Sequence, residues 1–331
     1  MGRVYYNGLH WNSPVDSTPQ LQYAATPGFQ SAFVVAQGEI SFNNFVTHYN
    51  GWKDQCAWIQ NHGRTQEIVL RLYWPSADCQ TGSCPMAGDP GASLGQQFYN
   101  EIVQYAVDNF NIRNFQVLNE LNIEYECCKP RAQLAGDMFN IAWHIKHLAN
   151  QNNRGIVYLG FPGPGGDSAE PTNPDWNAYW DFYKTYITMG TDQGPAYNWL
   201  AVHAYDGSSQ PVWGLQDRMN RQYDSLVSKL PQYPHRWTEY GIPMNYQNSP
   251  FGSPPWHDPQ YQDRAWYCRS AIQSFKIHVE SKNPAGPDVW SVFYYIAYNS
   301  DAEAQGGLYG RLQLVEDDNH LTPAGIMAAA F

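Results

Sequence analysis

The sequence lacks the features of membrane proteins and of nucleic-acid-binding proteins. It contains no run that approaches the roughly 18 consecutive apolar residues of a membrane-spanning helix. Basic residues are scarce, because 19 Lys and Arg stand against 30 Asp and Glu, for a formal net charge of −11. Nucleic acids and anionic membranes bind clustered positive charge, so we expect neither as a partner. A neutral substrate is compatible with this charge balance.

Metal-binding and targeting motifs are also missing. The six cysteines include no CxxC pair and no neighbouring His pair, so their spacing predicts neither a metal site nor a cofactor. The first residues do not resemble a signal peptide. Four cysteines lie in polar loops, where they either form disulfides or stay free: Cys79, Cys84, Cys127 and Cys128. Since disulfides would indicate an oxidising compartment, we expect a secreted or extracellular protein. Cys56 and Cys268 lie in helical patterns and are predicted to be buried.

Short apolar runs alternate with longer amphipathic segments along the whole chain, without an internal repeat or a low-complexity segment. This alternation is typical of a parallel sheet covered by helices. Eight strands are predicted, at residues 4–11, 31–36, 68–73, 115–119, 156–161, 200–205, 236–240 and 289–297. Eight strands close a barrel, which takes about 250 residues or more. We therefore predict an α/β fold, a (β/α)8 TIM barrel, as a single domain over residues 1–331 with long βα loops.

Helices and loops fit the same fold. Helical spacing of apolar residues predicts helices over 98–110, 134–148 and about 260–281. Several long segments that follow strands are rich in Gly, Pro, Asn and Ser, and in an α/β barrel such loops form the active-site face. We expect the loops around 76–92, 162–175 and 243–258 to decide whether the site is an open cleft or a closed pocket.

Two glutamates stand at the ends of predicted strands that are distant in the sequence. Asn119-Glu120 closes the fourth strand, and Glu239 lies on the seventh, before Tyr240. The dipeptide alone is a weak signal, because Asn100-Glu101 repeats it inside a predicted helix. Position at a strand end distinguishes Asn119-Glu120, since parallel strands of a barrel bring their carboxyl ends to one face. Two carboxyl groups on one face are what acid–base and nucleophilic chemistry at a glycosidic bond requires.

This pattern resembles clan A of the glycoside hydrolases, whose members carry Asn-Glu at the end of the fourth strand and Glu on the seventh. The resemblance implies a retaining double displacement through a covalent glycosyl-enzyme, with Glu120 as general acid/base and Glu239 as nucleophile. Asn119 resembles the residue that hydrogen-bonds the sugar 2-hydroxyl. The implied substrate is a β-linked oligo- or polysaccharide, and no metal or organic cofactor is implied.

Two further strands carry residues that match this clan. His203-Ala204-Tyr205 on the sixth strand resembles the His-x-Tyr of family 5 cellulases and mannanases, in which the Tyr orients the nucleophile and the His lines the site. The period of two along a strand places His203 and Tyr205 on the same face. Arg71, on the third strand, stands where the clan often has an arginine, and beside Glu239 it would favour the ionised carboxylate.

The eighth predicted strand departs from the pattern of the clan. Clan A enzymes usually carry a Trp there that floors the sugar site, but here Trp290 comes too early in the strand. Tyr295 and Tyr298 are candidates to replace it. Trp74, which follows the third strand, is a further candidate, because an aromatic ring packs well on the C–H face of a pyranose. The family within the clan and the identity of the sugar therefore stay open.

Other interpretations of the same residues exist. The glutamates could be solvated carboxylates, Arg71 a structural ion pair, and His203 and Tyr205 core residues. Two functional alternatives are a transglycosylase with the same residues and a non-catalytic carbohydrate-binding barrel. A metal-dependent barrel hydrolase would need a His/Asp cluster near the first strand, where only His10 stands. We predict a monomeric O-glycosyl hydrolase that is endo-acting rather than exo-acting.

Overall fold

A computed structural model describes residues 4–11, 31–37, 51–61, 67–74, 91–205, 211–241, 260–282, 288–294, 315–317 and 320–321. The chain divides into two compact units. Unit 1 comprises Met1–Val34, Asp54–Ile68 and His203–Phe331, and unit 2 comprises Val35–Lys53 and Val69–Val202. Of the predicted loops, 76–92 and 243–258 fall almost entirely outside the described residues.

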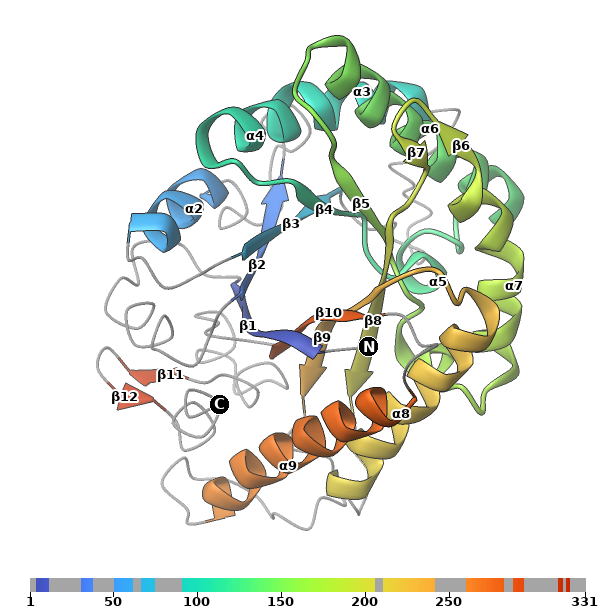
Figure 1. Cartoon of the computed structure of the whole chain (residues 1–331). Coiled ribbons are helices and arrows are strands. Elements are labelled where there is room, and N and C mark those ends of the chain that lie inside the picture. Colours follow the sequence, from blue (N-terminus) through green and yellow to red (C-terminus); the bar gives the residue numbers. More distant parts are fainter. Residues whose placement is uncertain are drawn as a thin grey trace. The chain divides into compact units, whose positions relative to one another are not determined.

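The strands have the order of a closed (β/α)8 barrel. Eight of the strands that the structure describes follow one another as β1-β10-β9-β8-β5-β4-β3-β2 (Figure 1). Where the structure describes the register between neighbours in this order, the two strands run parallel. Their bounds are β1 (Val4–Trp11), β2 (Ser31–Gln37), β3 (Glu67–Tyr73), β4 (Asn114–Val117), β5 (Tyr158–Phe161), β8 (Trp199–Tyr205), β9 (His235–Gly241) and β10 (Val289–Tyr294). The predicted fold class is therefore confirmed, and most strand limits agree within two residues.

The strands are buried along nearly their whole length, as expected for a parallel sheet covered by helices. In β3, the residues from Ile68 to Leu72 are all buried, and in β9 every residue is buried. Such strands appear in the sequence as continuous apolar runs rather than as an alternation of apolar and polar residues. The few polar side chains inside these runs, such as Arg71 and Glu239, are therefore conspicuous.

In unit 1, two long helices cover β9 and β10. Helices α8 (Pro211–Lys229) and α9 (Gln260–Ser281) run side by side (Figure 1). The Trp237 ring of β9 packs on Phe275 of α9, with ring centroids 4.6 Å apart. The amide of Gln222, on α8, accepts a hydrogen bond from Trp237 Nε1 at 2.9 Å and donates one to the backbone oxygen of His203 at 2.8 Å. One buried side chain therefore ties α8 to both β8 and β9.

A buried ion pair lies at the amino-terminal end of the unit 1 strands. The Arg236 guanidinium donates to both carboxylate oxygens of Glu67, at 2.6 and 2.7 Å, and to the Ser291 hydroxyl at 2.7 Å. These residues stand at or near the starts of β9, β3 and β10. In (β/α)8 barrels this end serves stability, whereas the carboxyl end carries the chemistry. We interpret the pair as structural.

Unit 2 contains β4 and β5 with their covering helices. These are α3 (Gly91–Phe98), α4 (Gln104–Phe110), α6 (Arg131–Gln151) and α7 (Pro174–Thr188), and α3 packs against α6. The helix predicted over 98–110 is interrupted by a π-helical turn at Tyr99–Val103. Helix α4 ends at Asn111 in the left-handed conformation, with φ of 51°, a common way to terminate a helix.

An aromatic cluster fixes the chain as it leaves β5. Phe161, the last residue of β5, contacts the rings of Tyr179, Trp180, Tyr183 and Tyr197, with centroids between 4.9 and 6.3 Å away. The Tyr179 hydroxyl donates to the backbone oxygen of Pro162 at 2.7 Å. Aromatic pairs of this kind add to the free energy gained by burying the rings. The start of the segment 162–166, which is predicted as a loop, is therefore held in place by packed rings and a hydrogen bond.

The remaining described elements are short. They are α2 (Trp52–Asn61), α5 (Leu121–Glu124), the 3-10 helix η4 (Gly166–Ala169), the hairpin of β6 (Gly190–Thr191) with β7 (Gly194–Pro195), and the pair β11 (Val315–Asp317) with β12 (His320–Leu321). Among the described helices, none is long and apolar enough to cross a membrane.

The cysteines that the structure describes fall into two groups. Cys127 and Cys128, which follow α5, are both disulfide-bonded. Cys56, on α2, is free and fully buried, and burial raises the pKa of its thiol far above the ordinary value. Its predicted burial is therefore confirmed, whereas Cys79, Cys84 and the side chain of Cys268 lie outside the described residues.

Candidate active site

The Glu239 carboxylate is the centre of a polar group in unit 1. It is 7% exposed on a strand whose residues are all buried. Its Oε2 accepts a hydrogen bond of 2.7 Å from the Tyr205 hydroxyl and lies 3.6 Å from Nδ1 of His203. Its other oxygen, Oε1, lies 3.7 Å from Nε2 of His10. Three side chains from two other strands, β1 and β8, therefore surround this carboxylate.

The backbone of β9 is irregular where it presents Glu239. Val292 of β10 pairs with Trp237, and Tyr294 pairs with Tyr240, so that a step of two residues on β10 faces a step of three on β9. Thr238 and Glu239 together therefore face the single residue Phe293. Such β-bulges bend a strand and change the direction of a side chain, and they are frequent beside active sites. The direction of the Glu239 side chain therefore depends on this bulge and does not follow from a strict alternation of side chains along β9.

In unit 2, the segment that carries Glu120 departs from the prediction. Strand β4 ends at Val117, two residues earlier than predicted, and Leu118 adopts the left-handed conformation with φ of 58°. For a non-glycine residue this conformation costs about 1–2 kcal/mol. Two hydrogen bonds stabilise it: Leu118 N donates to Leu72 O at 3.0 Å, and the buried Gln116 amide donates to Leu118 O at 2.9 Å. The turn delivers Asn119 and Glu120 to the start of α5.

Glu120 is partly exposed and starts the short helix α5. Its backbone oxygen accepts hydrogen bonds from the amides of Ile123 and Glu124, each at 2.9 Å. Its carboxyl group lies directly against Gly165, since a Cβ atom built on that glycine would come within 2.1–2.4 Å of all three carboxyl atoms. Accessibility combined with a fixed backbone suits a group that must exchange a proton with a bound molecule.

Asn119 is held by a carboxylate from the same turn. Its amide nitrogen donates to Oε1 of Glu124 at 2.7 Å, and it is 8% exposed. The amide oxygen is buried and has no hydrogen-bond partner among the described residues. A buried polar atom without a partner is costly and is common where a ligand completes the site. Glu124 therefore orients Asn119.

Tyr125 connects this turn to the end of β3. Its hydroxyl donates to the backbone oxygen of Trp74 at 2.5 Å. Burial raises the pKa of Tyr125 well above its ordinary value, the negative charge of Glu124 raises it further, and the positive charge of Arg71 opposes the rise. The Arg71 side chain, which is 5% exposed, therefore acts electrostatically on this residue. The Trp74 ring is half-buried and meets Phe98 edge to face at 6.4 Å.

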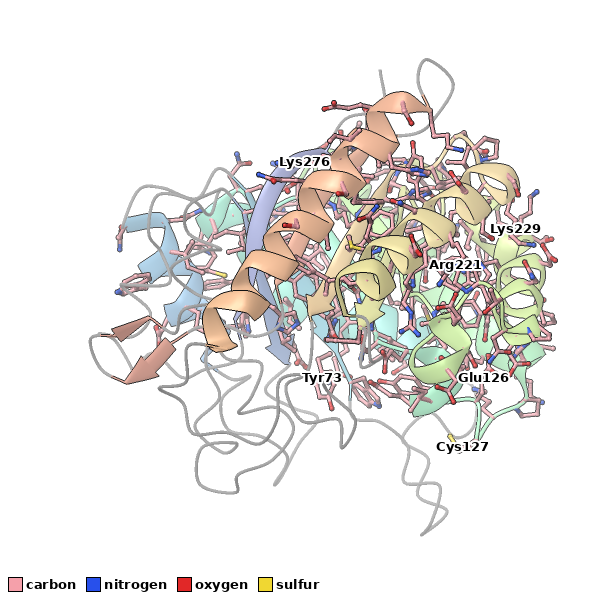
Figure 2. All side chains as sticks on the ribbon, turned by 90° about the horizontal axis from the view of Figure 1, so that it is seen from below. Tyr73, Glu126, Cys127, Arg221, Lys229 and Lys276 are labelled. Carbon is pink, nitrogen blue, oxygen red and sulfur yellow. The ribbon has the colours of Figure 1, made fainter. Side chains whose placement is uncertain are left out.

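The neighbouring acidic residue Glu126 has a structural contact instead. It accepts two hydrogen bonds from the Arg131 guanidinium, at 2.9 and 2.7 Å, and one from the Tyr183 hydroxyl at 3.0 Å. Figure 2 shows Glu126 and Cys127 on the same lower side of unit 2 as Tyr73 at the end of β3. We infer that Glu126 anchors the segment after α5 to α7.

The eight residues predicted for the site are placed unevenly. The structure groups Glu239, His203 and Tyr205 in unit 1, and it groups Glu120, Asn119, Arg71 and Trp74 around α5 and β3 in unit 2. Tyr295 lies outside the described residues, as does Tyr298. Sequence reasoning missed His10 as a neighbour of Glu239, although a histidine on a buried strand was a visible signal. Asn122 and Gly165, which lie next to Glu120 in the structure, stand in no pattern that sequence reasoning could detect.

Comparison with known proteins gives a fold and no family. No protein-family model matches the chain, and no curated protein matches it. Solved structures do: a fungal β-1,4-galactanase has a TM-score of 0.67 at 12% identity, with 98% of each chain covered. A family 39 glycoside hydrolase from Bacteroides cellulosilyticus WH2 has a TM-score of 0.60 at 12% identity, covering 99% of this chain and 63% of that one.

A third similar structure is the exo-β-1,4-mannosidase Op5Man5 from Opitutaceae bacterium strain TAV5. Its TM-score is 0.61 at 12% identity, and the match covers 100% of this chain and 59% of that one. The chain therefore spans about three fifths of the length of two of these structures and nearly all of the galactanase. The predicted (β/α)8 barrel fold is thus confirmed.

Proposed function

We propose that the protein is a retaining glycoside hydrolase that cleaves a β-linked oligo- or polysaccharide, with Glu239 as nucleophile and Glu120 as general acid/base. The observation that carries the proposal is the environment of Glu239. A buried carboxylate that accepts a 2.7 Å hydrogen bond from a tyrosine, with two imidazoles within 3.7 Å, is fixed in orientation and stabilised as an anion. An oriented anion is what attack at an anomeric carbon requires.

The reaction proceeds in two displacements. In the first, a Glu239 oxygen forms a bond to the anomeric carbon while the bond to the leaving oxygen breaks, and the Glu120 carboxyl gives its proton to that oxygen. In the second, water attacks the same carbon and gives a proton to the Glu120 carboxylate, and the ester bond to Glu239 breaks. Glu120 is accessible enough to exchange protons with both the leaving group and water.

Asn119, His203 and Trp74 are proposed to bind the sugar, and Arg71 to contribute positive charge. Asn119 is the best supported of these, because its buried amide oxygen has no partner among the described residues and its nitrogen is already held by Glu124. An amide oriented in this way accepts a hydrogen bond from a sugar hydroxyl. Tyr205 is proposed to orient Glu239, and Tyr295 remains a proposed sugar contact outside the described part of the chain.

The biological setting follows from the same residues. We propose a secreted, monomeric enzyme without a metal or organic cofactor, and an endo-acting rather than an exo-acting one. Secretion is supported by the disulfide-bonded state of Cys127 and Cys128, since disulfides persist in oxidising compartments. The β-1,4-galactanase and the exo-β-1,4-mannosidase of similar fold support a β-linked glycan as the substrate class.

The proposal is tested by a hydrolysis screen on aryl β-glycosides and soluble β-glycans with the wild type, Glu120→Gln and Glu239→Gln. Both variants keep the size of the side chain and remove its acid–base or nucleophilic function. We expect the wild type to cleave at least one substrate and the Glu239 variant to lose at least about 1,000-fold in rate, because it lacks the nucleophile. For Glu120→Gln we expect a loss of about 100- to 10,000-fold on substrates with poor leaving groups.

Three other outcomes have distinct meanings. Binding of a glycan without cleavage would indicate a carbohydrate-binding barrel. Transfer to an added acceptor sugar in preference to water would indicate a transglycosylase. Cleavage that survives Glu239→Gln would show that another residue is the nucleophile. If a crystal structure of the protein without a bound sugar shows the two carboxyl groups near 6.5–9.5 Å apart, rather than about 5–5.5 Å, the retaining mechanism is wrong.

A further inference from the structure

The close approach of Gly165 to Glu120 is a feature that the catalytic roles above do not explain. A Cβ atom at position 165 would lie 2.1 Å from Glu120 Cδ, 2.3 Å from Oε1 and 2.4 Å from Oε2. All three distances are similar, so the flat face of the carboxyl group lies on the glycine. Ordinary van der Waals contact begins at about 3.4 Å, and glycine is therefore the one residue that leaves room for the carboxyl group in this position.

Asn122 holds Gly165 in place through two hydrogen bonds. The Asn122 amide oxygen accepts from Gly165 N at 2.9 Å, and the Asn122 amide nitrogen donates to Gly165 O at 3.1 Å. Both backbone polar groups of the glycine are thus bound by one side chain. Since Asn122 lies two residues after Glu120, on α5, the same helix carries the carboxyl group and fixes the surface against which it rests.

Backbone conformation does not account for the glycine. Gly165 has φ of −102° and ψ of 175°, an extended conformation that any residue adopts. The next glycine, Gly166, has φ of 61°, in the left-handed region, and so meets a conformational need. At Gly165 the missing side chain serves a different purpose, which is the space occupied by the Glu120 carboxyl group.

We propose that Asn122 and Gly165 are positioning residues that form a rigid seat for the Glu120 carboxyl group during proton transfer. This inference rests on the proposed function of Glu120. The acid/base group must reach the leaving oxygen in one step and water in the next, and small displacements of such a group are costly. A seat made of backbone restricts where the carboxyl group can lie.

The test compares four variants with the wild type: Gly165→Ala, Asn122→Leu, Glu120→Gln and, as a matched control, Gly136→Ala. Gly136 lies on α6, where an added Cβ would meet no atom within 4 Å. The substrates are a dinitrophenyl glycoside, whose leaving group departs without a proton, and the corresponding phenyl glycoside, whose leaving group needs one. The value of kcat/KM is measured for both, because it reports the first displacement.

We expect Gly165→Ala to lower kcat/KM on the phenyl glycoside by about 10- to 100-fold and on the dinitrophenyl glycoside by less than about 3-fold. Asn122→Leu should also lower kcat/KM selectively on the phenyl glycoside, but by a smaller factor. Gly136→Ala should not change kcat/KM on either substrate. General damage to the fold would lower both values together. If Gly165→Ala loses equally on both substrates or matches the wild type, the seat has no catalytic role.

The result for Glu120→Gln separates this inference from the proposed function. If that variant lacks the selective loss on the phenyl glycoside, Glu120 is not the acid and the proposed function itself fails. A crystal structure of Gly165→Ala gives a reading that needs no substrate. The Glu120 carboxyl group should move by at least about 1.3 Å, the shift that restores ordinary contact with the new methyl group. An unmoved carboxyl group would overturn the inference.

Discussion

At the scale of single residues, the Glu239 carboxylate is oriented by Tyr205. Among the described residues, the tyrosine hydroxyl donates to it at hydrogen-bond distance, whereas the two imidazole nitrogens lie at 3.6 and 3.7 Å. Hydrogen bonds to charged groups contribute about 1.5–3 kcal/mol. Part of that energy keeps the nucleophile oriented toward the substrate.

We therefore expect Tyr205→Phe to lower kcat/KM by about 10- to 100-fold, which is roughly the factor in rate that corresponds to the free energy of a hydrogen bond to a charged group. Steady-state kinetics on the substrate found in the screen measure the loss. Tyr197→Phe is the control, because it removes a buried hydroxyl that donates to the Met138 carbonyl of α6 at 2.8 Å. The control should lose stability and keep its rate. Equal rates for wild type and Tyr205→Phe would refute an orienting role for Tyr205.

Residue patterns in the sequence predicted contacts along a strand better than contacts around a turn. His203 and Tyr205 could be placed on one face because the period of two holds along β8. The orientation of Asn119 and Glu120 could not be predicted, because it depends on the left-handed turn at Leu118 and on Gln116, Leu72 and Gly165, which the chain brings together only on folding.

At the scale of elements, helix α8 supports the strands that carry the nucleophile group. Gln222 is fully buried, and its amide joins the backbone of β8 to the Trp237 indole of β9. The His203 backbone oxygen and the Trp237 indole nitrogen are both buried, and without the Gln222 amide each would lose this hydrogen bond. Each polar group left buried without a partner costs about 1–3 kcal/mol.

Replacing Gln222 by Leu should lower the free energy of unfolding by about 2–4 kcal/mol, because it leaves the His203 carbonyl and the Trp237 indole nitrogen without partners. Denaturant unfolding measures the change. Gln216→Leu, a half-buried position on the same helix, provides the matched control and should change stability by less than about 1 kcal/mol. A loss no larger than that of the control would mean that water replaces the amide.

The strands and some of the long helices were predictable, whereas the elements that shape the site were not. Continuous apolar runs such as 68–72 identify buried strands, and the apolar spacing from Leu134 to Leu148 identifies α6. The one-turn helix α5, the π-helical turn at Tyr99–Val103 and the bulge in β9 are too short to leave a period in the sequence. Tertiary contacts decide them.

At the scale of the whole molecule, the stability of the fold is linked to a histidine that is buried without a polar partner among the described residues. His235 begins β9, is fully buried, and lies between the rings of Tyr223 and Trp237, with centroids 5.5 and 6.0 Å away. Within the described part of the chain, neither ring nitrogen has a hydrogen-bond partner. Burial lowers the pKa of His235 from its ordinary 6.5 to about 3.

The shift makes the folded state sensitive to acid. Below about pH 6.5 the unfolded chain binds a proton at this histidine, whereas the folded chain stays neutral there until about pH 3. The contribution of His235 to stability is therefore complete above pH 6.5 and is lost as the pH falls toward 3. The slope is about 1.4 kcal/mol for each pH unit in that window, in favour of the unfolded state.

We expect His235→Phe to remove this slope, because a phenyl ring takes up no proton and suits an aromatic site. The free energy of unfolding, measured with denaturant between about pH 8 and pH 4.5, should fall less steeply for the variant than for the wild type, with a difference approaching about 2–3 kcal/mol at the acid end. Comparison at pH 8, where the histidine is neutral in both states, isolates the packing change. Because other titrating groups are common to both proteins, parallel curves would mean that folded His235 accepts a proton as readily as the unfolded chain.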